Sequence, residues 1–316
     1  MFRKNCLTIP AVNDATKFGK VAVLFGGNSA ERAISLEGGQ AVLNALRNRQ
    51  VEAYGIDVGR STLQQLTQNH YDRIFLMLHG RGGEDGTVQG ALETLGLAYT
   101  GSGVSGSALS MDKARTKYLW QATGIPTPRF QVAKSETEIL AAAKELGFPL
   151  IVKPVHEGSS IGASKITSTK ELSEAWCLAS SYDSFVLVER WVDGVEYTAA
   201  ILGQTVFPLI RLETPRTFYD FEAKYSDSAG TQYHCPCGLG SYQEKLLGDM
   251  ALRAFEVLGA CGWGRVDFIC DASGEPWFIE VNTIPGMTGH SLVPMAAHAA
   301  GISFDDLVWR ILETSF

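Results

Sequence analysis

The chain has 316 residues, of which 45% are hydrophobic and 19% charged, and its formal net charge is −7. These values are typical of a well-packed globular protein with room for two or three domains. The acidic balance disfavours a nucleic-acid partner, since a phosphate backbone requires a basic surface. No apolar run has the length of a signal-peptide core or a membrane span, so the sequence predicts a cytoplasmic protein with no membrane partner.

Strands and helices alternate in the first part of the chain. This order is typical of a doubly wound α/β domain built on a parallel sheet. Ligands bind such sheets at the carboxyl ends of the strands, which are here the segments 26–31 and 79–86. The elements expected are strands at 20–25, 53–58 and 73–78 and a helix at 35–49.

The middle and last parts of the chain mix short strands with helices. Two capping-box matches, Ser135-x-x-Glu138 and Ser168-x-x-Glu171, predict helix starts. The segment 218–239 is long, polar and rich in Gly, Asp and Ser, which is typical of a binding loop or lid. The elements expected are helices at 107–123, 136–146, 170–179, 243–258, 292–300 and 304–314, and strands at 150–153, 185–188, 196–202 and 205–212.

A pair of strands near the C-terminus carries the strongest chemical pattern. The polar turn at 270–275 predicts an antiparallel hairpin that brings Asp267, Glu280 and Asn282 together at one end. Carboxylate and amide oxygens are ligands for a hard cation such as Mg²⁺. Arg265 beside them can offer a planar donor fork to an anion. Acidic residues at hairpin ends are also commonly just solvated, which is the alternative for this site.

A second pattern places a lysine before a turn rich in glycine and serine. Lys153 ends a strand, and the backbone N–H groups of 156–162 can wrap phosphate oxygens. Taken alone, the turn fits an ordinary hairpin equally well, the strand at 186–192 fits a core strand, and Lys113 fits a solvated surface lysine. Neither a Walker A motif nor a Gly-x-Gly-x-x-Gly motif occurs, which weakens a nicotinamide-dependent alternative.

The six cysteines are scattered along the chain, which is typical of reduced thiols. His234, Cys235 and Cys237 lack a second ligand pair at zinc-site spacing, so we expect loop cysteines there rather than a metal site.

Together these patterns resemble the ATP-grasp superfamily, and more closely the D-alanine–D-alanine ligase family. The resemblance covers nearly everything from Lys20 to Glu313. Five long motifs carry it in order: Leu-Phe-Gly-Gly-Asn-Ser-Ala-Glu-Arg from 24, Leu-His-Gly-Arg-Gly-Gly-Glu-Asp-Gly from 78, Val-Lys-Pro-Val-His-Glu-Gly-Ser-Ser-Ile-Gly from 152, Tyr-Asp-Phe-Glu-Ala-Lys-Tyr from 219 and Glu-Val-Asn-Thr-Ile-Pro-Gly-Met-Thr from 280.

The resemblance implies an α/β protein, α+β in its ATP-binding part, with an ATP-grasp fold behind an N-terminal doubly wound parallel-sheet domain. The implied parts are an extension at 1–18, the N-terminal domain at 19–105, a central subdomain at 106–188 and a C-terminal subdomain at 189–316 with its lid at about 218–239.

The resemblance also implies how ATP and metal would be held. Two Mg²⁺ ions, with Mn²⁺ as an alternative, would lie on Asp267, Glu280 and Asn282, the trio that the hairpin already indicates. The nucleotide set would comprise Lys113, Lys153 and Lys224 on the phosphates, Glu189, Val192 and Glu196 on adenine and ribose, and Ser159, Ser160 and Arg190 beside them.

At the amino-acid end, the family pattern implies formation and capture of an acyl phosphate. The residues implied are Glu31 and His79 for the first D-alanine, Arg265 and Gly286 for the oxyanion, Ser291 and Leu292 for the second carboxylate, and Ser159 and Tyr225 for fastening the lid towards Glu31. The chain departs from the family at Arg190, where lysine is common, and at Ile284, where a small polar residue is common.

Tyr225 discriminates between second substrates in this family, because tyrosine accompanies dipeptide formation and phenylalanine accompanies D-lactate. The expected protein is therefore a homodimeric ATP- and Mg²⁺-dependent ligase that makes D-alanyl-D-alanine for peptidoglycan. The alternatives are a D-alanine–D-lactate enzyme, a non-catalytic nucleotide-binding protein on the same fold, and, more remotely, a Rossmann oxidoreductase.

Overall fold

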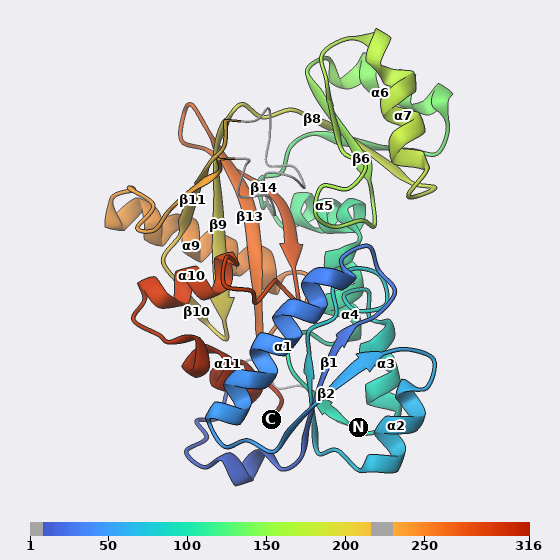
Figure 1. Cartoon of the computed structure of the whole chain (residues 1–316). Coiled ribbons are helices and arrows are strands. Elements are labelled where there is room, and N and C mark those ends of the chain that lie inside the picture. Colours follow the sequence, from blue (N-terminus) through green and yellow to red (C-terminus); the bar gives the residue numbers. More distant parts are fainter. Residues whose placement is uncertain (1–8, 216–229) are drawn as a thin grey trace.

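The computed structural model describes residues 9–215 and 230–316. In this part of the chain three sheets, each covered by helices, follow one another from the N-terminus to the C-terminus (Figure 1). No helix in the same ranges is both long enough and apolar enough to span a bilayer.

The N-terminal sheet is parallel, with strand order β2-β1-β3-β4, which confirms the predicted α/β class. Residues 21–24 of the first strand are fully buried, as expected for a strand covered on both faces. Gly26 and Gly27, with φ of 80° and 75°, let the chain turn sharply out of this strand. The elements are β1 (Val21–Gly26), α1 (Arg32–Asn48), β2 (Ala53–Val58), α2 (Thr62–Asn69), β3 (Arg73–Leu76), α3 (Thr87–Thr94) and β4 (Ala98–Tyr99).

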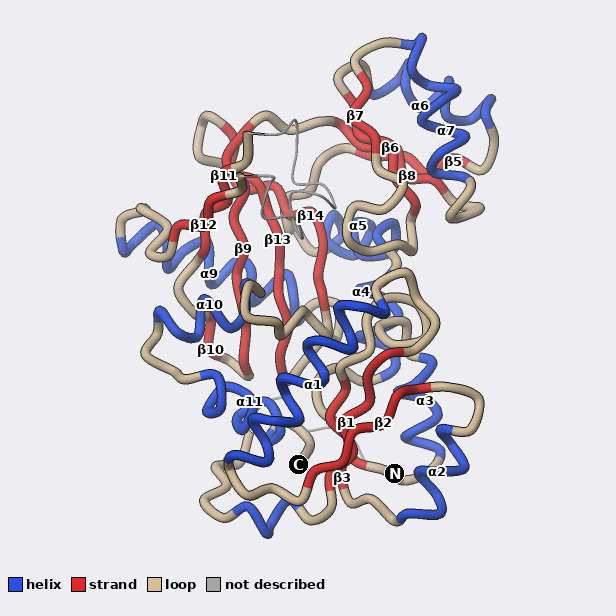
Figure 2. Tube along the Cα trace, viewed as in Figure 1, coloured by secondary structure: helices blue, strands red, loops and turns tan. Residues whose placement is uncertain are grey.

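The central sheet is antiparallel, with strand order β5-β8-β6-β7, and helices α6 and α7 cover one of its faces (Figure 2). Ser135 caps α6 by accepting from the N–H of Glu138, as predicted, although the Glu138 carboxylate accepts from the N–H of Lys134 and so does not complete the box. At the second predicted box, the Ser168 side chain makes no cap hydrogen bond. The elements are α4 (Val104–Met111), α5 (Lys113–Ala122), β5 (Phe130–Ala133), α6 (Glu136–Leu146), β6 (Leu150–Pro154), β7 (Ser164–Ile166), the 3₁₀ turn η2 (Thr169–Glu171), α7 (Leu172–Ser180) and β8 (Val186–Arg190).

The C-terminal sheet has the order β12-β11-β9-β13-β14, with β10 paired to β9. Helix α9 packs its buried face, which includes Leu247, Ala251 and Phe255, against this sheet. The elements are β9 (Gly194–Leu202), β10 (Thr205–Val206), β11 (Ile210–Glu213), β12 (Gln232–His234), α9 (Ser241–Glu256), β13 (Trp263–Asp271), β14 (Pro276–Asn282), α10 (Leu292–Ala299) and α11 (Phe304–Glu313).

The last helix returns to the N-terminal sheet and shares its core. Helix α11 lies beside α1 (Figure 1). The rings of Trp309 and Phe18 pack edge-to-face, with 4.8 Å between their centroids. The N–H of Val12 donates to Glu313 Oε1 at 2.7 Å, and the short turn η1 (Ala15–Phe18) follows. The described end of the N-terminal extension is therefore packed on α11.

The structure corrects several boundaries. The single helix predicted at 107–123 is broken at Asp112, whose extended backbone ends α4 and whose side chain caps α5 through the N–H of Arg115. The single strand predicted at 205–212 is divided by Pro208, which has no N–H to donate to the ladder. The segment predicted as a loop at 218–239 contains β12, since Tyr233 pairs with Leu212 of β11. Helices α2 and α3 were not predicted.

The cysteines follow the prediction at four positions. Cys177, Cys235, Cys237 and Cys270 are free thiols. Cys261 is disulfide-bonded, so the expectation of reduced thiols is wrong at that position.

Candidate active site

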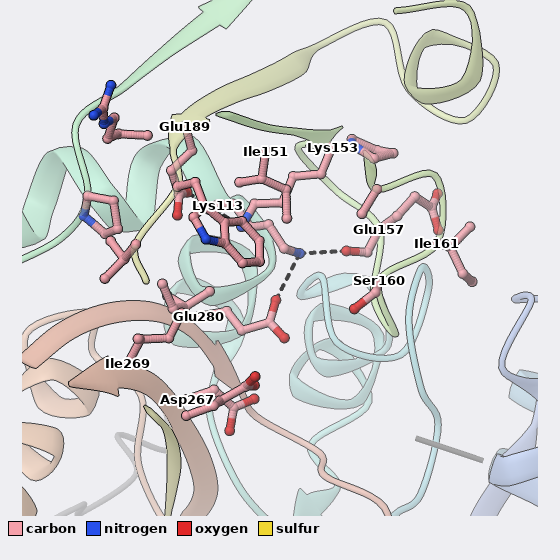
Figure 3. Close-up of a pocket in the computed structure, with 18 residues that line it drawn as sticks. Lys113, Ile151, Lys153, Glu157, Ser160, Ile161, Glu189, Asp267, Ile269 and Glu280 are labelled. Atoms are coloured by element: carbon pink, nitrogen blue, oxygen red, sulfur yellow. Dashed lines mark hydrogen bonds and ion pairs between the residues drawn. The ribbon is translucent and has the colours of Figure 1, made fainter. Parts of the chain in front are cut away.

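The predicted hairpin is confirmed. Strands β13 and β14 pair antiparallel, with Asp267 opposite Glu280 and Arg265 opposite Asn282. The pair turns its polar end towards the central sheet, where Figure 3 shows Asp267 and Glu280 below Lys113. A β-bulge after Asp267 shifts the register. The local pattern was sufficient here because the short turn fixes which residues face one another.

Asp267 is the most constrained carboxylate of the hairpin. It is 8% exposed and accepts from Thr198 Oγ1 at 2.5 Å, from Asn282 Nδ2 at 3.1 Å and from two nitrogens of Arg265. The guanidinium neutralises the buried charge, as burial of a carboxylate requires.

Asp267, Glu280 and Asn282 offer two carboxylates and an amide, a donor set that fits a hard cation. No cluster of three or more His, Cys, Asp or Glu side chains in residues 9–215 and 230–316 is placed to hold a metal. The metal prediction therefore rests on this mixed trio, which the fold brings together.

A pocket of about 810 Å³, including its mouth, opens between the central sheet and the hairpin (Figure 3). Apolar side chains from both sheets, including Ile151, Ile269 and Ile279, line it and offer surface for a flat ring. The predicted nucleotide residues that line it are Lys113, Lys153, Ser160, Glu189, Arg190, Val192 and Glu196, and Asp267 and Glu280 of the metal trio join them.

Lys113 reaches across this pocket rather than into solvent. Its side chain is 9% exposed, and its ammonium lies 3.5 Å from Glu280 Oε2 and donates to the carbonyl of Glu157 at 2.5 Å (Figure 3). The surface-lysine alternative is therefore wrong. The lysine starts α5, directly after the break at Asp112, so the break aims it at the pocket.

A second group of cations surrounds Glu189 at the inner wall of the pocket. Lys117 Nζ lies 2.9 Å and Lys153 Nζ 3.4 Å from the same oxygen, Oε2. Burial lowers the pKa of the Lys117 ammonium to about 8, against the opposing effect of Glu189. Lys117 was missed by the sequence reasoning, although it lies one turn beyond Lys113 on the same helix face.

Arg190 lines the pocket but turns its guanidinium away from it. Nη1 donates to the carbonyls of Leu146 and Phe148, at 3.2 and 3.1 Å, beyond the C-terminal end of α6. The family departure at this position therefore places its charge outside the pocket.

Glu31 and Ser159, 128 positions apart, meet beside the nucleotide pocket. The hydroxyl of Ser159 donates to Glu31 Oε1 in a short hydrogen bond. Ser159 and Ser160 both have positive φ, 50° and 58°, so the turn that presents them is strained. A Cβ on the preceding Gly158 would lie 2.8 Å from Glu31 Oε2, so a larger residue there would displace the Glu31 carboxylate.

His79 and Glu84 join the N-terminal loop to the end of the hairpin. His79 Nδ1 lies 2.8 Å from the carbonyl of Ile284, while its buried Nε2 has no hydrogen-bond partner among the described residues. Burial lowers the pKa of His79. Glu84 accepts from the N–H groups of Gly80 and Ile284, and burial, reinforced by the charge of Glu31, raises its pKa to about 8. Glu84 was not among the predicted site residues.

Helix α10 begins at Leu292 with Ser291 before it, as predicted. Ser291 Oγ accepts from the N–H of Thr288 at 2.9 Å. A Cβ on Gly286 would lie 2.9 Å from Ser291 Oγ, so glycine permits the tight turn that brings this loop onto the helix start. Lys224 and Tyr225, together with the part of the lid at 218–229, lie outside the described residues.

The sequence of this chain is similar to that of known ligases over most of its length. Residues 119–313 match the family model of the D-ala D-ala ligase C-terminus, and residues 56–102 match that of the D-ala D-ala ligase N-terminus. A D-alanine–D-alanine ligase from Methylococcus capsulatus is 57% identical over 305 residues, which are 96% of this chain and 98% of that protein.

Two solved structures share the fold. A Bacillus anthracis D-alanine–D-alanine ligase complexed with ATP has a TM-score of 0.81 at 30% identity, and the match covers 94% of this chain and 97% of that one. The VanG D-Ala:D-Ser ligase of Enterococcus faecalis has a TM-score of 0.82 at 31% identity, covering 94% and 99%. With an ATP-grasp architecture, both family models and a relative of this identity over nearly its whole length, the chain belongs to the D-alanine–D-alanine ligase family.

Proposed function

We propose that this chain ligates two D-alanines to D-alanyl-D-alanine for peptidoglycan synthesis, with ATP converted to ADP and phosphate. The observation that carries the proposal is the convergence of Lys113, Lys153 and Glu189 with the hairpin carboxylates in one pocket, next to the Glu31–Ser159 pair. Membership of the ligase family supports the same reaction. We place it in the cytoplasm, where ATP is supplied, as a homodimer.

The nucleotide would lie with its base against the apolar wall and its phosphates towards the two lysines. Lys113 and Lys153 supply positive charge, and the N–H groups of the turn at Ser159 and Ser160 supply donors. Glu189, Val192 and Glu196 also line the pocket, and adenine and ribose would fit against them. Lys224, on the lid, is proposed to complete the phosphate contacts.

Asp267, Glu280 and Asn282 would hold two Mg²⁺ ions, with Mn²⁺ as a substitute. Bound there, the metal would neutralise phosphate charge and orient the transferred group. The chain's own contribution is to keep these oxygens close together and to neutralise Asp267 through Arg265.

The first D-alanine would bind with its ammonium at Glu31 and with His79 nearby. A carboxylate oxygen attacks the terminal phosphorus of ATP, the bond to the bridging oxygen breaks, and ADP leaves. The acyl phosphate formed carries a good leaving group. Ser159, and Tyr225 on the lid, would fasten the closed lid and keep water from the intermediate.

The second D-alanine would bind with its carboxylate at Ser291 and the N–H of Leu292, at the start of α10. Its neutral amine attacks the acyl carbon, and Arg265 and the N–H of Gly286 donate to the developing oxyanion. Phosphate then leaves as the carbon–oxygen bond breaks, and the amine nitrogen loses its proton. These steps account for the dipeptide, the ADP and the phosphate.

ADP release with Mg-ATP and D-alanine, with products identified by mass, tests the proposal. D-Lactate and D-serine are added in separate runs, because the VanG neighbour is a D-Ala:D-Ser ligase. Dipeptide formed together with ADP supports the proposal. ADP release that appears only with D-lactate or D-serine would transfer the assignment to the corresponding alternative ligase. ATP binding without D-alanine-dependent turnover would favour the non-catalytic nucleotide-binding alternative.

A further inference from the structure

Lys117 is a buried cation that the ligation mechanism above does not use. Its side chain is completely buried within α5, and its ammonium forms an ion pair with Glu189 Oε2 at 2.9 Å. A lysine charge is seldom buried without a fixed partner, since its desolvation must be offset by pairing and hydrogen bonds. Glu189 is 2% exposed, so each charge supplies the compensation that the other needs.

The position of Lys117 is fixed by contacts with the central sheet and with the C-terminal sheet, which flank the pocket. Its Nζ donates to Thr127 Oγ1 at 2.7 Å, and Thr127 Oγ1 donates in turn to the carbonyl of Phe278 at 2.8 Å. Phe278 belongs to β14 of the hairpin, whereas Glu189 belongs to β8 of the central sheet. The ammonium therefore sits at a fixed point between the two sheets and can hold Glu189 in one orientation.

Lys153 contacts the same oxygen of Glu189, but at the longer distance of 3.4 Å. Lys153 lies just before the turn at 156–162 that is proposed to hold phosphate. In the proposed function Lys153 contacts ATP phosphates, which draws its charge away from Glu189. Lys117 does not line the pocket, so no ligand competes for it. With nucleotide bound, Lys117 is the counter-charge that stays with this carboxylate.

We propose that Lys117 is a positioning and specificity-determining residue, which holds the Glu189 carboxylate in one orientation so that the pocket selects 6-amino over 6-oxo purine nucleotides. The inference rests on the proposed ATP site. An ionised carboxylate only accepts hydrogen bonds. The 6-amino group of adenine can donate to Glu189, whereas the 6-oxo group of hypoxanthine presents a second acceptor to it.

Removing Lys117 should release the Glu189 carboxylate from the orientation that the ion pair at 2.9 Å fixes, and leave it the longer contact with Lys153 at 3.4 Å. A carboxylate that turns away from the base no longer accepts from a 6-amino group and no longer disfavours a 6-oxo group. Selectivity, and not only affinity, should therefore respond to Lys117.

The experiment measures the dissociation constants of Mg-ATP and Mg-ITP for the full chain by titration calorimetry. Lys117→Met keeps the length of the side chain without its charge, and it should lower the ATP-to-ITP preference by about tenfold or more, the value of a hydrogen bond to a charged group. Lys245→Met is the matched control, because Lys245 is an exposed lysine that pairs with Asp249 on α9. Its preference should equal that of the wild type.

A double-mutant cycle with Glu189→Gln separates this role from a general loss of packing. If Lys117 acts through Glu189, the preference of the double variant should equal that of Glu189→Gln alone. Additive losses, or a wild-type preference in a folded Lys117→Met protein, would overturn the inference. If Lys117→Met does not fold, Lys117→Gln, which keeps a donor but no charge, provides the same comparison. Wild-type protein that binds neither nucleotide would instead overturn the proposed function.

Discussion

Arg265 and Asp267 point to the same side of β13 and form a two-pronged ion pair, with Nε to Oδ1 at 2.8 Å and Nη2 to Oδ2 at 2.7 Å. The proposed oxyanion donor and a proposed metal ligand are thus held by one contact. The same contact aligns the guanidinium plane, because a carboxylate fixes both prongs of the fork.

Arg265→Ala should lower kcat by about 10²-fold or more, as expected for the loss of one oxyanion donor. Raising the Mg²⁺ concentration should not restore activity. Without Arg265 the negative charge of Asp267 is no longer neutralised, so weak metal binding is not the expected cause of the loss. Steady-state kinetics at several Mg²⁺ concentrations test this, with the exposed Arg60→Ala as the matched control. Near-normal kcat in Arg265→Ala would exclude the role.

Gly158→Ala should raise the KM for D-alanine by about ten- to a hundredfold, because the added Cβ would meet Glu31 Oε2 at 2.8 Å and displace its carboxylate. The KM for ATP should change less. Gly59→Ala is the control, since a Cβ there meets nothing within 4 Å. An equal rise in both KM values would indicate that the whole turn has moved, and would contradict a specific effect on Glu31.

Tyr225→Phe should increase D-alanyl-D-lactate relative to dipeptide when both second substrates compete. The phenol hydroxyl is proposed to favour attack by the amine, and its loss removes that preference. Product ratios by mass spectrometry give the result, with Tyr242→Phe, at an 82% exposed tyrosine of α9, as the control. An unchanged ratio would remove Tyr225 as the selectivity element.

His156 gives the chain a pH-dependent contribution to stability. Its Nδ1 lies 2.7 Å from Asp183 and its Nε2 3.1 Å from Asp112, and hydrogen bonding to Asp112, then to Asp183, raises its pKa. A raised histidine pKa stabilises the fold fully below the unfolded value of about 6.5, and this stabilisation is lost as the pH rises through the folded pKa.

The melting temperature of His156→Gln should therefore lie a few degrees below that of the wild type at about pH 6, and the difference should shrink by about pH 9. Thermal unfolding monitored by fluorescence across this range measures it. The exposed His298→Gln serves as the control. A difference in melting temperature between wild type and His156→Gln that stays constant with pH would mean that the charge of His156 contributes nothing to stability.

The sequence by itself determined the features that depend on near neighbours. The apolar run at 20–25 and the glycines after it predicted a parallel strand, and the polar turn at 270–275 predicted the β13–β14 hairpin with Asp267 and Glu280 together. Ser135 marked the start of α6, because its side chain bonds the backbone only three residues ahead. Such patterns are readable because turn length and side-chain periodicity fix them locally.

Only the tertiary structure decided the contacts that join distant segments. Nothing near Lys117 indicates that its ammonium meets Glu189, and Lys113 could be distinguished from a surface lysine only when Asp112 was found to break the helix. The Glu31–Ser159 bond likewise closes a loop of 128 residues. Pairings of this kind depend on how whole sheets and helices pack, and packing is set by the sum of many contacts rather than by the spacing of residues along the chain.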